Sequence, residues 1–139
     1  VAPGIYELIY VGHETKRIFE VDKLYMHFEI ATIGEYYGRV VTRYYAVECQ
    51  DDTKRNGRYK AGWKSDHMRE HVNLFGERPR RKDEIPITPY KQFIILGRIE
   101  TVTRNRDKQA YPEPLHYSRV AELLEVVKDL TVPSLMPTP

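Results

Sequence analysis

The chain has 139 residues, of which 41% are hydrophobic and 30% are charged, and its formal net charge is +2. This length suits one domain with a core of its own, and the composition excludes wholesale disorder. No apolar run is long enough to span a bilayer, and the single Cys49 cannot form an internal disulfide, so we expect a cytoplasmic protein without membrane contact.

Two strands are expected at the start of the chain. Residues 5–15 are rich in β-branched and aromatic residues, and both faces are apolar, as in a long bent strand of a closed barrel. Residues 24–32 alternate strictly between apolar and polar side chains. We expect Leu24, Met26, Phe28 and Ile30 to face inward, and Tyr25, His27 and Glu29 to face outward.

A third strand is expected over residues 39–49, after a turn bounded by two glycines. Arg39, Arg43 and Tyr45 occupy odd positions and share one face of it. Because arginine is seldom buried without a partner, we expect this odd face to point outward. The predicted inward residues are therefore Val40, Thr42, Tyr44 and Ala46.

The middle of the chain is basic. Residues 54–82 contain ten basic and three acidic side chains, so the remainder of the chain is acidic.

Residues 50–62 are polar with two glycines and predict a mobile loop. Ser65 has the chemistry of an N-cap, and a helix is expected over residues 66–75 before Gly76 ends it. After a proline-marked linker that runs to Tyr90, a fourth strand is expected over residues 92–103, bent at Gly97.

Residues 116–128 fit both helical and strand periodicity. We favour a strand, because four strands leave an open edge that a fifth would close. The predicted fold is then mainly β, an OB-like five-stranded Greek-key barrel with one helix between the third and fourth strands. The alternative is an α+β fold with a C-terminal helix. Residues 1–130 form the single expected domain, and residues 131–139 form a proline-rich tail.

Several patterns suggest catalysis, and none is complete. Residues 57–65 resemble a phosphate-binding GxxxxGK[ST] loop, but Trp63 separates the last glycine from the lysine. His67 and His71 have metal-ligand spacing without an obvious third ligand, and two exposed histidines are the simpler interpretation. Asp52 and Lys54 match part of a metal-dependent nuclease motif that is only three residues long. We therefore expect no enzyme, no catalytic residue, no metal and no cofactor.

The remaining pattern combines aromatic and basic residues. Tyrosine supplies 11 of the 16 aromatic side chains. Flat rings stack on unpaired bases while lysine and arginine contact phosphates, so this combination predicts a platform for single strands. In the barrel the platform lies on the second and third strands, flanked by loops that carry Lys16, Arg17, Phe19 and Lys23. The expected nucleic-acid-binding residues are Tyr25, His27, Arg39, Arg43, Tyr45, Arg58, Tyr59, Lys60, Trp63, Lys64, Arg104, Arg106 and Lys108. The competing interpretation is that half or more of the tyrosines belong to the core or its rim.

The segments GIYELIYVGHET, LYMHFEI, GEYYGR, RYYAV, GWKSD and LHYSRVAELLEVV span most of the chain. On these segments the chain resembles small proteins of phages, plasmids and other mobile elements that themselves resemble OB-fold single-stranded-DNA-binding proteins. The resemblance implies a replication or recombination accessory that binds single-stranded nucleic acid, DNA in the first place, without sequence preference. It equally implies an anti-defence protein that inhibits a host or phage protein by contact; a metal-dependent nuclease is a further alternative. We expect a homo-oligomer, although the chain ends in PSLMPTP and lacks the acidic tail of bacterial single-strand-binding proteins.

Overall fold

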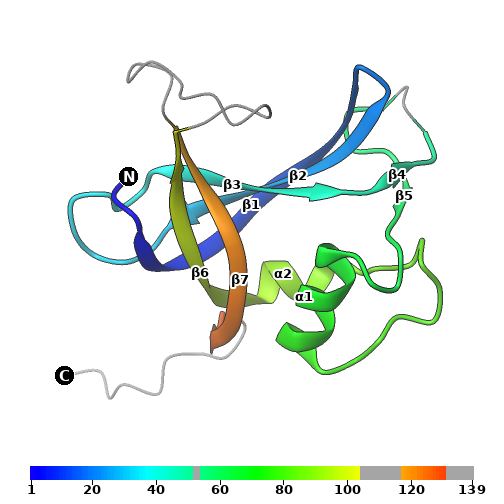
Figure 1. Ribbon diagram of the computed structural model, residues 1–139. Coiled ribbons are helices and arrows are strands. Elements are labelled where there is room, and N and C mark those ends of the chain that lie inside the picture. The colour runs from blue at the N-terminus through cyan, green and yellow to red at the C-terminus, as the bar shows by residue number, and fades with distance from the viewer. Residues whose placement is uncertain (52–53, 104–116, 131–139) are drawn as a thin grey trace.

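A computed structural model of the chain describes residues 1–51, 54–103 and 117–130, and it is mainly β (Figure 1). Five long strands follow one another around a closed ring in the order β1-β2-β3-β7-β6. Their bounds are Gly4–Ile18 for β1, Val21–Ile30 for β2, Val40–Ala46 for β3, Phe93–Val102 for β6 and Tyr117–Asp129 for β7. Within the described ranges, no helix has the length and apolar character needed to cross a membrane.

The hairpin of β1 and β2 extends beyond the ring (Figure 1). Ile18 pairs with Val21, so only Phe19 and Glu20 form the turn, and both have positive φ angles, 51° and 64°. Asparagine and glycine are the residues that favour such a turn, so this backbone is strained. Further along β1, the register shifts between Tyr10 and Gly12, which gives the predicted bend of the first strand.

The ring closes at a narrow seam between β3 and β7. These two strands run parallel and share a single residue pair, Arg43 with Val120, whereas β6 and β7 pair over their whole length. The helix α1 (Asp66–Phe75) packs against both strands of the seam. Because β3 and β7 share so few backbone hydrogen bonds, side chains of α1 that contact both strands help to hold the ring closed.

The ends of α1 are set by local sequence, as predicted. The Ser65 hydroxyl accepts a hydrogen bond from the Met68 amide at 3.3 Å, and Gly76 ends the helix with a left-handed φ of 77°. A second, five-residue helix, α2 (Thr88–Gln92), follows in the segment that we predicted to be a linker, and it starts with Pro89 in the first turn. Both helices lie at the same end of the ring (Figure 1).

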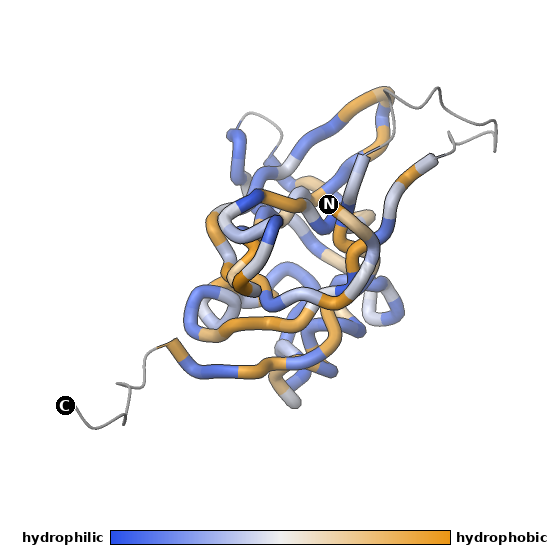
Figure 2. The backbone as a smooth tube through the Cα atoms, turned by 90° about the vertical axis from the view of Figure 1, so that its left-hand side faces the viewer, coloured by the Kyte–Doolittle hydropathy of each residue, from blue (hydrophilic) through white to orange (hydrophobic). Residues whose placement is uncertain are grey.

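The core is formed by alternate residues of the strands and by α1. The inward positions of β2 are confirmed, since Leu24, Met26, Phe28 and Ile30 are all buried. Hydrophobic and hydrophilic residues are interspersed along the backbone (Figure 2). Gly97 lies where the β6–β7 register shifts, and a Cβ atom there would come within 2.4 Å of the Leu8 side chain. The expected bend at Gly97 is thus accompanied by a close approach of β1.

Residues 50–51 and 54–62, the described part of the segment predicted to be a mobile loop, contact the rest of the fold. β4 (Glu48–Cys49) and β5 (Tyr59–Lys60) form a small two-stranded sheet, and Tyr59 is buried. The amide of Thr15 in β1 donates to the Arg55 carbonyl at 2.7 Å, which attaches this segment to the hairpin. The segment therefore packs on the ring.

The ambiguous C-terminal segment is the strand β7, so the fifth strand is confirmed and the alternative with a C-terminal helix is wrong. The third strand is shorter than predicted, because β3 ends at Ala46 and β4 begins at Glu48. Residues 131–139, predicted to be a tail, lie outside the described residues.

Candidate nucleic-acid interface

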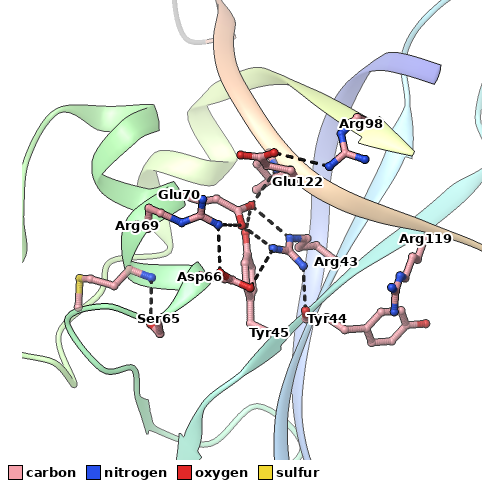
Figure 3. Close-up of polar contacts among 12 residues, drawn as sticks. Arg43, Tyr44, Tyr45, Ser65, Asp66, Arg69, Glu70, Arg98, Arg119 and Glu122 are labelled. Carbon is pink, nitrogen blue, oxygen red and sulfur yellow. Dashed lines mark hydrogen bonds and ion pairs between the residues drawn. The ribbon is translucent and has the colours of Figure 1, made fainter. Parts of the chain in front are cut away.

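The register of β3 is opposite to the prediction. Arg43 and Tyr45 point toward α1, whereas Tyr44 lies on the other side of the sheet, beside Arg119 (Figure 3). Tyr45 is 1% exposed and Arg43 is 8% exposed, so neither can belong to a binding surface. Arg39 is exposed but precedes the strand, so its exposure does not determine which face of β3 points inward. The predicted surface therefore loses its central tyrosine.

A buried carboxylate explains this register. Glu70 of α1 is fully buried and accepts hydrogen bonds from Nε and Nη2 of Arg43, the former at 3.2 Å. It also accepts from the Tyr45 hydroxyl at 2.9 Å and from the Leu123 amide at 2.8 Å. Arg43 can be buried because Glu70 supplies a counter-charge, without which arginine is seldom buried. Burial, assisted by the nearby Glu70 charge, raises the pKa of Tyr45 well above its usual value.

The outer face of β2 and β3 nevertheless carries aromatic side chains. Tyr25 and Tyr44 are directly opposite in the ladder, and their rings meet edge to face with centroids 4.8 Å apart. The Lys16 ammonium lies 4.8 Å from the Tyr25 ring centroid. Both tyrosines are half-buried, so part of each ring is open to solvent. A one-residue change of register thus replaces Tyr45 by Tyr44 on this surface.

The aromatic row continues onto β7. Burial raises the pKa of Tyr44, and the neighbouring hydroxyls of Tyr117 and Tyr25 raise it further. Arg119, which pairs with Glu100 at 2.7 Å, opposes this pKa shift from the same side of the sheet. Tyr117 is 43% exposed and forms the open end of the row.

A polar cluster adjoins the two tyrosines, with His27 and Thr42 paired two positions farther from the hairpin turn than Tyr25 and Tyr44. His27 contacts Thr42 at 2.7 Å and Glu14 at 2.8 Å, and Arg55 donates to Glu14 at 3.0 Å. The hydrogen bond from Arg55, followed by that from His27, lowers the pKa of Glu14 to about 2. Glu14 is therefore ionised at neutral pH, with its charge balanced by Arg55 and Lys16.

The hairpin end is apolar and exposed. Phe19 is 94% exposed, Ile18 and Val21 are each more than 40% exposed, and a shallow groove runs from these residues past Lys23 to Tyr25. Lys16 and Lys23 are directly opposite in the ladder, an arrangement of like charges that an anion would relieve. The outer face and the hairpin form a continuous surface, which we call the sheet face: Lys16, Phe19, Lys23, Tyr25, His27, Thr42, Tyr44, Tyr117 and Arg119.

Among the remaining residues predicted to bind nucleic acid, the prediction for Tyr59 is wrong. It is 8% exposed, and its hydroxyl contacts His67 Nε2 at 3.0 Å. Arg39 is exposed and lies 5.6 Å from the ring of Tyr36, away from the outer face of β3.

Other predicted residues lie on different parts of the molecule. Arg58 and Lys60 are paired with Asp83 and Glu48, respectively. Trp63 and Lys64 line a separate groove beside α1. Arg104, Arg106 and Lys108 lie outside the described residues. Among the described residues of the predicted binding set, the sheet face brings together Tyr25 and His27, and it also includes Lys16, Phe19 and Lys23 of the predicted flanking loops.

The two histidines of α1 are not exposed, contrary to prediction. His67 is fully buried and His71 is 3% exposed; the latter contacts the Tyr90 hydroxyl at 3.0 Å. Burial, with the charges of His71 and Arg43, lowers the pKa of His67 to about 3. In the described part of the chain no group of three potential ligands could hold a metal. Cys49 is buried, and Asp52 lies outside the described residues.

The sequence contains a signal that could have corrected the register. Glu70 falls at helical spacing between His67, His71 and Leu74, all of which are buried on one face of α1. An acidic residue on the inward face of a helix requires a cation nearby, and Arg43 is such a cation on a neighbouring strand.

Comparison of the chain with protein-family models, curated proteins and solved structures found no match.

Proposed function

We propose that the protein is an OB-like Greek-key barrel that binds single-stranded nucleic acid, DNA in the first place, on its sheet face and catalyses no reaction. The observation that carries the proposal is the pair of Tyr25 and Tyr44 rings on the outer face of β2 and β3, with the Lys16 ammonium over the Tyr25 ring and Arg119 beside Tyr44 (Figure 3). Exposed rings can stack on bases of any sequence, and the cations can contact phosphates.

The arrangement of the strands supports this proposal. The helices lie between the third and fourth long strands, and the last strand closes the ring beside the third. In OB folds the face of the second and third strands, with the loop between the first two, is the usual surface for oligonucleotides. Here that loop is the strained turn that exposes Phe19. Backbone strain at an exposed aromatic residue is typical of a functional position.

Fluorescence anisotropy with a labelled fifteen-nucleotide oligothymidine, titrated at several salt concentrations, tests the proposal. The four cations on or beside the sheet face are Lys16, Lys23, Arg55 and Arg119. If each neutralises one phosphate, log K falls against log salt with a slope of about −3. Binding that is absent at low salt, or equal for single strands and duplex, contradicts the proposal.

Substitutions locate the surface. Tyr44→Ala removes one stacking ring and weakens binding by about ten-fold, within the range expected for one base–aromatic contact. Tyr37→Ala is the matched control, because Tyr37 is a 63% exposed tyrosine in the turn that follows β2. Equal losses of affinity in both variants would mean that the sheet face is not the site.

A further inference from the structure

A groove beside α1 is separate from the sheet face. It has a volume of about 410 Å³, and its apolar floor is formed by Trp63, Met68 and Val72. Met68 and Trp63 belong to a small hydrophobic cluster that also contains buried Ala61 and Ile85, so the floor is supported from beneath. The groove lies near the lower end of the volumes that hold ligands in proteins, about 300–1000 Å³.

The rim of the groove is cationic. Lys64, Arg69 and Arg78 line it together with Asn73, and no carboxylate lines it. Arg69 is paired with Asp66 at 3.0 Å, whereas neither Lys64 nor Arg78 has a carboxylate within 4.0 Å in the described part of the chain. Lys64 also precedes the N-terminus of α1, whose dipole adds to the positive potential.

We propose that this groove binds an acidic segment of a partner protein that places a large apolar side chain on the floor formed by Trp63, Met68 and Val72. Carboxylates of the segment pair with Lys64 and Arg78, which have no carboxylate within 4.0 Å among the described residues. Methionine adapts its shape to different side chains and suits such a floor. Residues 131–139 of the chain itself contain no acidic side chain and do not match this charge.

The groove suits a peptide better than a nucleotide. The Arg78 guanidinium lies 3.9 Å from the centroid of the Trp63 ring and covers one face of it, where a base would otherwise stack, so the apolar side chain of a peptide contacts Met68, Val72 and the remaining part of the Trp63 side chain. The rest of the floor is a thioether and a branched aliphatic side chain, which offer no flat surface. This inference is independent of the proposed function of the sheet face.

Selection from a randomised dodecapeptide display library, followed by anisotropy with a labelled enriched peptide, tests the proposal. Enriched sequences are expected to combine at least two acidic residues with a large apolar residue. The variant Lys64→Glu with Arg78→Glu should weaken the peptide at least ten-fold. Lys54→Glu with Arg80→Glu makes the same charge change at exposed positions outside the groove and should change affinity less than two-fold.

Trp63 provides an independent measurement because it is the single tryptophan of the chain. Its emission should shift when the peptide binds, and circular dichroism verifies that each variant is folded. The proposal is overturned if no peptide is enriched, if enriched peptides lack acidic residues, or if both double variants bind equally. It is also overturned if oligothymidine displaces the peptide and shifts Trp63 emission, which would assign the groove to nucleic acid.

Discussion

Glu70→Gln removes the charge that balances buried Arg43 while it preserves the size of the side chain. Breaking a buried ion pair on one side costs about 3–5 kcal/mol, because the remaining charge has no counter-ion. The amide oxygen of glutamine cannot accept from Arg43, Tyr45 and Leu123 with the capacity of two carboxylate oxygens. We therefore expect the free energy of unfolding to fall by about 3–5 kcal/mol, a large part of the roughly 5–15 kcal/mol typical of a domain.

Urea unfolding followed by circular dichroism and by Trp63 fluorescence measures this change. Asp66→Asn is the control on the same helix; its side chain is 66% exposed, so the cost should stay below about 1 kcal/mol. Replacing both partners, Arg43→Met with Glu70→Leu, should restore part of the lost stability, because no unpaired charge remains while the Tyr45 hydroxyl and the Leu123 amide lose their acceptor. Hydrogen exchange at the Leu123 amide should be faster in Glu70→Gln.

A loss smaller than about 1 kcal/mol in Glu70→Gln would refute this account of the β3–β7 seam. So would a double variant that is less stable than Glu70→Gln alone. Either result would mean that α1 is held against the ring by apolar contacts and that the carboxylate adds little.

Three further predictions concern other parts of the structure. The pKa of His67 in the folded protein is about 3, so its neutral form contributes stability that is present above about pH 6.5 and lost as the pH falls toward 3. His67→Gln should therefore flatten the acid-unfolding curve between these two pH values. An unchanged curve would contradict the burial of a neutral His67. Replacing Phe19 and Glu20 by Asn-Gly should raise the free energy of unfolding by about 1–2 kcal/mol in urea. If Phe19 contacts nucleic acid, the same variant should bind oligothymidine more weakly than the unmodified protein. A variant with unchanged stability and unchanged binding would contradict both the strain in the turn and the contact of Phe19 with nucleic acid. Gly97→Ala should cost about 1–3 kcal/mol in thermal or urea unfolding, because its methyl group meets Leu8, and an unaffected variant would contradict this packing.

Local signals made part of the fold predictable. The helix of residues 66–75 was predicted correctly because Ser65 and Gly76 define its ends within the sequence itself. The inward positions of β2 followed from strict alternation of apolar and polar residues. The fifth strand was predicted from the need to close an edge. The short helix α2 was missed because its single turn is packed against β1 and carries little periodicity.

The candidate site was less predictable, because its register depends on a distant residue. Arg43 faces inward only because Glu70, 27 positions further along, supplies a counter-charge. Tyr25 and His27 were identified from alternation, and Tyr44 was missed with the register of β3. Arg119 was missed because it lies in residues 116–128, which fitted both helical and strand periodicity. Tyr59 was placed in a loop because its two-residue strand is too short to show a pattern.

The seam between β3 and β7 also affects how the chain is made. Arg43 of β3 pairs with Val120 of β7, so β3 has no neighbour on this side until residues 44–120 are synthesised, which takes about 4–15 s at ordinary translation rates of roughly 5–20 residues per second. During this interval β3 is an open edge, and charged residues that point inward are a known defence of such edges against pairing with other chains. Arg43 occupies this position before Glu70 is available to it. The residue that forms the buried ion pair of the finished protein can thus protect the nascent chain from aggregation on the ribosome.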